Sequence, residues 1–217
     1  MAIRAYNELY IDSAQRTLGD AFDFAIVTLC IDPSDFEKMI VKSDAIIQFE
    51  SGNPAYVCGI NGCELARKVI TQSGYSFKDK PDEMYMDKSP EYWCGWILAY
   101  YQWFTDRHFK EILSAVKIND LLKMYPVFHE MDEIKFVEAM NKRIEKLYPL
   151  TKLRMFRENC GLSQSELARL ADIPLRQIQM FEQRQRDINK TQAITLYKLS
   201  KALHCDMDNL IEVEIDF

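Results

Sequence analysis

The chain has 217 residues, a length that fits one domain or one domain with a small module, and 48% of them are hydrophobic, which excludes a disordered chain. Seven glycines and seven prolines are few for this length, so the composition excludes collagen-like, low-complexity and many-hairpin β folds and predicts an all-α protein. The net charge of −6 at pH 7 argues against nucleic acid as a partner of the chain as a whole.

The charge is distributed unevenly along the chain. Residues 1–148 hold 17 Lys and Arg against 23 Asp and Glu, residues 149–205 hold 10 against 5, and residues 206–217 hold five acids and no base. A basic surplus is therefore confined to 149–205, which restores nucleic acid as a candidate partner of that segment.

The sequence predicts a cytoplasmic protein. The first residues mix charge among apolar side chains and lack the apolar core of a secretory leader, and six scattered cysteines fit reduced thiols better than a disulfide framework. The most apolar stretch, residues 92–104, is shorter than the roughly 20 residues that cross a bilayer. No membrane partner is expected.

Residues 1–148 predict a helical N-terminal domain. Asp32-Pro33 and Ser89-Pro90 each pair an N-cap with a proline at the first helical position. Residues 61–64 have the spacing of a capping box, and residues 130–147 carry an apolar stripe typical of an amphipathic helix, which consists of Ile134, Val137, Met140, Ile144 and Leu147.

Residues 1–148 are also predicted to contain two non-helical segments and one buried helix. Residues 72–88 indicate a polar loop, and residues 55–58 a short extended piece after the turn at Gly52-Asn53-Pro54. Residues 91–107 predict a helix with aromatic bulk nearly all round it, which indicates a buried central helix; the alternative is a groove that uses those rings to hold a ligand or partner.

A boundary is predicted at Tyr148-Pro149, because proline stops the preceding helix. Five short helical segments follow: 152–160, 164–171 behind the capping box Ser163–Glu166, 175–184, an amphipathic run from Ile194 to Leu203 that begins after Asn189 or Thr191, and a last one with Leu210 and Ile211. We expect a five-helix domain over 149–212, similar to the lambda repressor, and an acidic tail over 213–217.

The segment 175–184 presents two different faces. At 100° per residue, Ile178 and Phe181 point to the domain core, and the opposite side carries Arg176, Gln179, Met180 and Gln183. Arg binds guanine O6 and N7, Gln binds adenine N6 and N7, and Leu suits a thymine methyl group. The predicted base contacts are Leu175, Arg176, Gln177, Gln179, Met180 and Gln183, and the predicted phosphate contacts are Ser163, Gln164, Arg184, Arg186 and Lys190.

The run from Arg157 to Glu212 resembles the Cro/C1 (Xre-type) helix-turn-helix family of regulators. The likeness rests on Gly161-Leu162-Ser163-Gln164, Leu167-Ala168, Ile178 with Glu182, and Ala202-Leu203, taken in order. The resemblance implies a structural ion pair between Arg157 and Glu182. The chain departs from the family at the turn glycine, which is Asp172, at the polar cap of the recognition helix, which is Pro174, and at the glycine after that helix, which is Arg184.

No other motif in the chain carries chemistry. Cys58 and Cys63 begin no complete zinc site, His108 and His129 lie near acids without a nucleophile or cleft, and no phosphate-binding loop or hydrolase motif is present. We therefore expect no enzyme, no metal and no cofactor.

The expected function is a DNA-binding transcriptional regulator, a repressor that binds double-stranded DNA as a homodimer on an inverted repeat. Residues 49–59 and 91–101 resemble a helical region that precedes such domains elsewhere and that we associate with toxin–antitoxin-like loci. The alternative is thus an antitoxin whose residues 1–148 mask a toxin partner through the rings around Trp93–Trp103.

Overall fold

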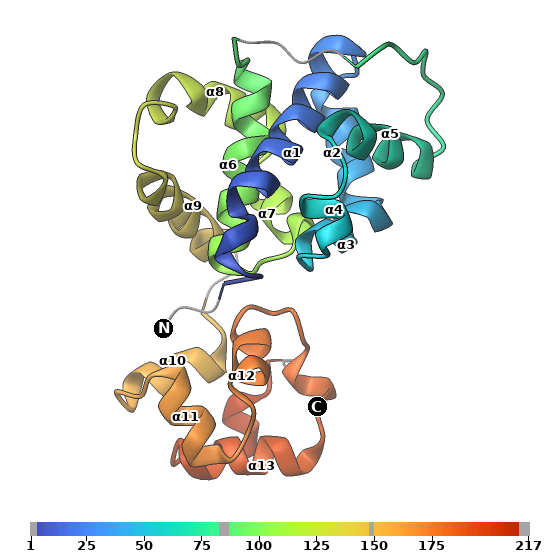
Figure 1. Ribbon diagram of the computed structural model, residues 1–217. Coiled ribbons are helices and arrows are strands. Elements are labelled where there is room, and N and C mark those ends of the chain that lie inside the picture. The colour runs from blue at the N-terminus through green and yellow to red at the C-terminus, as the bar shows by residue number, and fades with distance from the viewer. Residues whose placement is uncertain (1–3, 83–86, 148–149, 213–217) are drawn as a thin grey trace. The chain divides into compact units, whose positions relative to one another are not determined.

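The computed structural model describes residues 4–82, 87–147 and 150–212 (Figure 1). The chain divides into two compact units, Met1–Leu147 and Tyr148–Phe217. The described residues form helices, turns and loops and contain no strand, so the prediction of an all-α protein is confirmed. The expected break at Tyr148-Pro149 and the acidic tail over 213–217 lie outside the described residues.

The first unit is built from helices joined mostly by short connections. A 3-10 turn, η1 (Glu8–Tyr10), leads into the first helix, and a π-helical turn, η2 (Phe24–Thr28), continues it. The α-helices are α1 (Ile11–Asp23), α2 (Pro33–Lys42), α3 (Asp44–Glu50), α4 (Pro54–Val57), α5 (Gly62–Gln72), α6 (Pro90–Thr105), α7 (Phe109–Ala115), α8 (Ile118–Phe128) and α9 (Glu133–Leu147).

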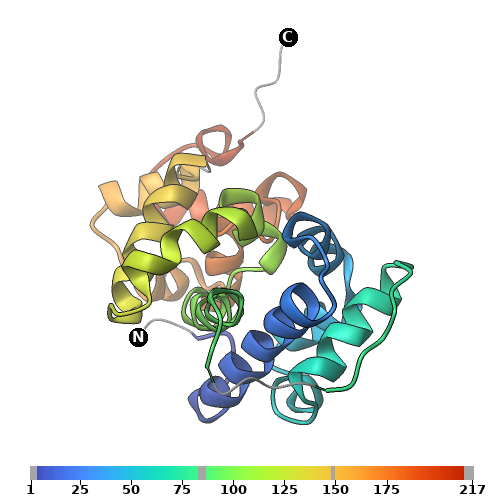
Figure 2. The same ribbon diagram turned by 90° about the horizontal axis from the view of Figure 1, so that it is seen from above.

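The helix α6 is the centre of this unit. Figure 2 looks almost down its axis and shows α1 beside it. The two helices approach so closely that a Cβ on Gly95 would lie 2.3 Å from the carbonyl oxygen of Leu18. Trp93, Tyr101 and Trp103 are buried, so the prediction of a buried central helix is confirmed.

Three predicted helix starts of the first unit are confirmed. Asp32 accepts a hydrogen bond from the Ser34 amide at 2.9 Å, and Ser89 accepts one from the Tyr92 amide at 2.9 Å. Asn61 and Glu64 form the capping box of α5. These starts depend on side chains within three residues of the helix they cap, which is why the sequence alone located them.

Two other helices of the unit begin without a local cap. The Glu50 carboxylate, on α3, accepts from the Phe109 amide at 2.9 Å, and the Glu37 carboxylate, on α2, accepts from the Ile118 amide at 2.9 Å. Both glutamates are buried. They supply the first amides of α7 and α8 with an acceptor and place negative charge at a helix N-terminus.

Three expectations for this unit were wrong in detail. Residues 55–57 are helical and not extended, because Asn53 caps α4 and Pro54 takes its first position. The helix predicted from 130 begins at Glu133, and Ile134 is 38% exposed because it lies at the free end of α9. The helix predicted to reach 107 ends at Thr105, where Asp106 is left-handed.

The second unit contains α10 (Lys152–Asn159), α11 (Gln164–Ala171), α12 (Leu175–Glu182), η3 (Ile188–Lys190), α13 (Ala193–Ala202) and η4 (Met207–Leu210). The helix α12 ends two residues earlier than predicted, because Arg184 takes a left-handed conformation with φ 57°. The helix α13 begins at Ala193, after Asn189 and Thr191 as predicted, and its N-cap residue Gln192 makes no side-chain hydrogen bond to the first turn. The last segment is a 3-10 turn that stops before Ile211.

Among the described residues, no helix combines the length and the apolar composition that crossing a bilayer requires.

Candidate nucleic-acid interface

The helix α12 is anchored in the second unit by its apolar face. Ile178 and Phe181 are buried in one cluster with Leu167 of α11 and Leu199 of α13. The helix follows α11 after a tight turn, which is the arrangement of a helix-turn-helix.

The opposite face of α12 differs from the prediction at one residue. Arg176 is exposed, and the other members of the predicted reading face, Leu175, Gln177, Met180 and Gln183, are partly exposed. Gln179 is only 6% exposed, so the expectation that its side chain points outward is wrong, and its contact with a base stays a prediction. Its position on the helix turns it toward the start of α11, where Gln164 covers it.

A buried network explains the orientation of Gln179. The Arg157 guanidinium donates to both oxygens of Glu182, at 2.6 and 2.9 Å, so the pair implied by the resemblance is present. The Gln164 side chain donates to Glu182 at 2.8 Å and accepts from Gln179 at 3.5 Å. Because the carboxylate accepts only, it fixes which way both amides point.

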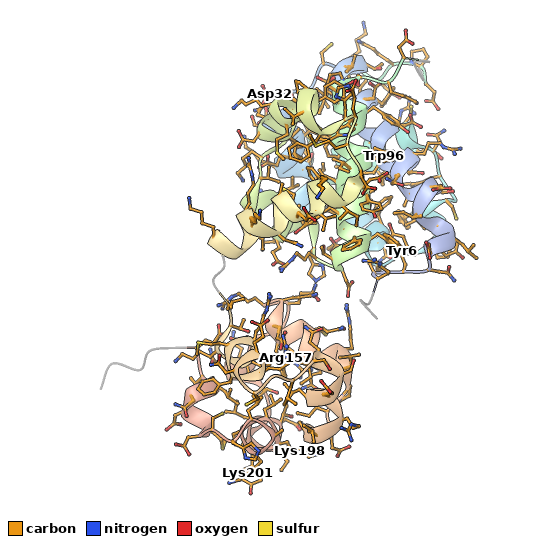
Figure 3. The ribbon with its side chains drawn as sticks, turned by 90° about the vertical axis from the view of Figure 1, so that its left-hand side faces the viewer. Tyr6, Asp32, Trp96, Arg157, Lys198 and Lys201 are labelled. Atoms are coloured by element: carbon orange, nitrogen blue, oxygen red, sulfur yellow. The ribbon has the colours of Figure 1, made fainter. Side chains whose placement is uncertain are left out.

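This network fastens three helices together. Glu182 ends α12, Arg157 lies in α10 and Gln164 begins α11. Figure 3 shows Arg157 inside the second unit. The network therefore holds α12 at a fixed angle to the start of α11, which is the geometry on which a reading helix depends.

The start of α11 is suited to an anion. Ser163 accepts from the Glu166 amide, and Glu166 accepts from the Ser163 amide, as the capping box predicted. Among the described residues no partner is present for the amides of Gln164 and Ser165, which lie in the first turn. Ser163 is exposed and keeps its hydroxyl proton for donation. The side chain of Gln164 is instead occupied by Glu182.

Lys198, for which the sequence predicted no role, contacts the turn between α11 and α12. Asp172 is left-handed, with φ 50°, where the family has glycine. Lys198 of α13 donates to its carboxylate at 2.7 Å and to its carbonyl oxygen at 3.3 Å. The ion pair lowers the pKa of Asp172. These two contacts compensate for the strain of a non-glycine residue at this position.

The other predicted phosphate contacts lie in the connection after α12. Arg186 is exposed and its guanidinium lies 5.7 Å from the centre of the Phe181 ring. Lys190 is exposed and lies 3.5 Å from the Asp187 carboxylate. Arg184 forms an ion pair with Glu212. Three basic residues, Arg184, Arg186 and Lys190, therefore follow α12 closely in sequence. In a helix-turn-helix bound to DNA, such residues flank the major groove and contact phosphates.

Elsewhere, the described residues contain no group of three metal-ligating side chains. His108 hydrogen-bonds Glu50 at 2.6 Å, a contact that belongs to the start of α7. Trp93 and Trp103 of α6 are buried, whereas Tyr92, Trp96, Tyr100 and Phe104, which follow one another at four-residue spacing, are partly exposed (Trp96 is labelled in Figure 3).

The comparisons with known proteins agree with this geometry. Residues 153–210 match the helix-turn-helix family HTH_3, which is of the Cro/C1 type. Neither the curated proteins nor the solved structures contain a match to the chain. The C-terminal part is thus a DNA-binding helix-turn-helix of a regulator.

Proposed function

We propose that this chain, whose residues 153–210 are a helix-turn-helix of the Cro/C1 type, is a sequence-specific transcriptional repressor. The observation that carries the proposal is the orientation of α12. Ile178 and Phe181 hold it from behind, while Arg176 is exposed in its first turn. The role needs binding and no catalysis.

The exposure of α12 bears on the expected operator. The exposed or partly exposed members of the predicted contact face are Leu175, Arg176, Gln177, Met180 and Gln183. Arginine pairs with guanine in the major groove, glutamine pairs with adenine, and apolar side chains contact the thymine methyl group. We infer a half-site in which a guanine lies among thymines and adenines.

A single helix-turn-helix covers one half-site, so we propose that two copies bind an inverted repeat. The half-sites would lie about one helical turn apart, roughly 34 Å between centres. We favour the repressor over an antitoxin that masks a toxin, because Trp93 and Trp103, the two ends of the predicted aromatic anchor, are buried.

The test is footprinting of the full chain on the DNA upstream of its own coding sequence, followed by selection from random duplexes. We expect a symmetric footprint and affinity that falls steeply with salt. Absence of specific binding would contradict the proposed repressor. A footprint without two-fold symmetry would contradict the proposed dimer.

Arg176→Ala tests the reading helix. We expect it to relax base preference at one position of the half-site, at a cost of about 1–3 kcal/mol. Replacing individual thymines with uracil in the same duplex removes the methyl group alone and locates the contacts of Leu175 and Met180. An equal loss on every sequence would instead make Arg176 a phosphate contact.

A further inference from the structure

Arg184, two residues after the end of α12, has a left-handed backbone conformation. Its φ is 57°, in the left-handed region that glycine adopts most easily. The turn is closed by the Arg184 amide on the Phe181 carbonyl at 3.1 Å and by the Arg186 amide on the Met180 carbonyl at 3.0 Å. A residue with a Cβ is strained in this conformation. We therefore ask which contacts the charged side chain of Arg184 makes.

Glu212 supplies a partner for that charge. Its carboxylate pairs with the Arg184 guanidinium through one oxygen. The other oxygen accepts from the Lys152 amide at 3.0 Å, and the Glu212 amide donates to the Asn189 side chain at 2.9 Å. These contacts hold Glu212 against the connection that follows α12.

The surroundings of this pair leave room for the arginine to change partner. A pocket of about 150 Å³ lies beside the pair and is lined by Phe181, Arg184, Arg186, Asp187, Ile188 and Glu212. The side chain of Arg184 is 38% exposed and that of Glu212 is 16% exposed. The guanidinium has solvent on one side, whereas the carboxylate is fixed in place.

A carboxylate and a phosphate offer the same chemistry to a guanidinium, since both accept two parallel N–H bonds. Arg184 follows Gln183 directly, at the end of the reading helix, where the DNA backbone borders the major groove. We propose that Glu212 occupies the phosphate-binding guanidinium of Arg184 in the DNA-free protein, and that a backbone phosphate displaces it. This inference rests on the proposed DNA-binding function.

The experiment compares variants of the full chain on a labelled DNA duplex of mixed sequence. Glu212→Gln keeps an acceptor for the Lys152 amide and removes the charge that competes for Arg184. Asp208→Asn is the matched control. Asp208 is exposed in η4, four residues before Glu212 in sequence, and its substitution removes one negative charge that does not pair with Arg184. Arg184→Gly removes the guanidinium while suiting the left-handed backbone, so the turn is preserved.

The readout is the ratio of the dissociation constant before a substitution to the one after it, at about 50 mM salt. Because the phosphate displaces Glu212 in wild type too, both complexes hold the same phosphate contacts, and Glu212→Gln removes only the cost of that displacement. The ratio for Glu212→Gln should therefore rise to about 2–5, the value of a partly exposed ion pair, and that for Asp208→Asn should rise less. In an Arg184→Gly background, Glu212→Gln should leave the ratio at 1, because the arginine for which Glu212 competes is absent. Arg184→Gly itself should make the salt dependence shallower by about 0.9, because one phosphate contact is lost.

Each outcome is decisive. A ratio for Glu212→Gln no larger than that for Asp208→Asn, or the same rise in the Arg184→Gly background, overturns the inference while salt-dependent binding by wild type leaves the proposed function intact. Failure of all the proteins to bind DNA overturns both.

Discussion

Both units contain locally capped helices, but only in the first do we find α-helices that begin on distant buried carboxylates among the described residues. In the second unit α10 and α11 are capped locally, by Thr151 on the Arg154 amide at 3.2 Å and by the Ser163–Glu166 box. In the first unit α7 and α8 begin on the buried carboxylates of Glu50 and Glu37, which lie 59 and 81 residues away in sequence.

The difference shows where each unit is vulnerable. Removing a local cap frays one helix end, whereas removing a buried distant carboxylate separates two helices and leaves an amide without an acceptor. The second unit has one comparable point, the Arg157–Glu182 pair, and there a charge is at risk as well.

Glu182→Ala should have the largest effect on stability. The side chains of Arg157 and Glu182 are 9% and 2% exposed, so the substitution leaves a buried cation with only the more distant carboxylate of Glu158, at 3.5 Å, and should cost about 3–5 kcal/mol. Denaturant unfolding of the full chain measures the loss, and hydrogen exchange should place it in residues 150–212. The double variant Arg157→Met with Glu182→Leu should recover most of it. A loss below about 1 kcal/mol would mean that water reaches the pair.

Glu50→Ala should come next and should act on the other unit. It leaves the buried amide of Phe109 without an acceptor, at about 1–3 kcal/mol. Exchange should accelerate in α7 and not in α10 to α12. Glu50→Gln keeps an acceptor and serves as the control; equal losses for the two variants would show that the charge, and not the hydrogen bond, holds α7.

Ser163→Ala should cost about 1 kcal/mol, the usual value of a local cap. The loss should be limited to faster exchange at the start of α11. If the whole second unit loosens, the capping box does more than hold one helix end, and the contrast drawn between the units is wrong.

The smallest expected effect is a pH dependence of the first unit. The hydrogen bond of the His108 ring to the Glu50 carboxylate raises the pKa of His108, and burial opposes this by lowering it. Because the folded pKa lies above the unfolded value, this contribution is complete at acid pH below the unfolded pKa and is lost as pH rises through the folded one. Unfolding of wild type and His108→Gln should therefore differ most below about pH 6 and converge at alkaline pH. A difference that grows with pH would contradict the pairing.

Much of the second unit was predictable because its signals are local. The capping box at Ser163, the turn at Asp172 and the apolar pair Ile178 and Phe181 act within a few residues of the helices they define. In the first unit Asp32, Asn61 and Ser89 located three helix starts for the same reason.

Helical periodicity also has a limit, which Gln179 illustrates. The 100° rule placed it with Arg176 on the outward side, and that angle is correct about the axis of α12. The angle does not state which neighbour covers it, and Gln164 does so here. The partnership of Lys198 with Asp172 could not be predicted either, because 26 residues separate them.

The sequence by itself determined the all-α class, the helix starts with local caps, and a C-terminal helix-turn-helix with Ile178 and Phe181 inside. Only the tertiary structure decided that Gln179 faces inward, that Arg184 meets Glu212, and that Glu37 and Glu50 begin distant helices. The physical reason is range: capping and amphipathicity act within a turn or two of helix, whereas the partner of a buried polar group is whichever side chain the fold brings to it.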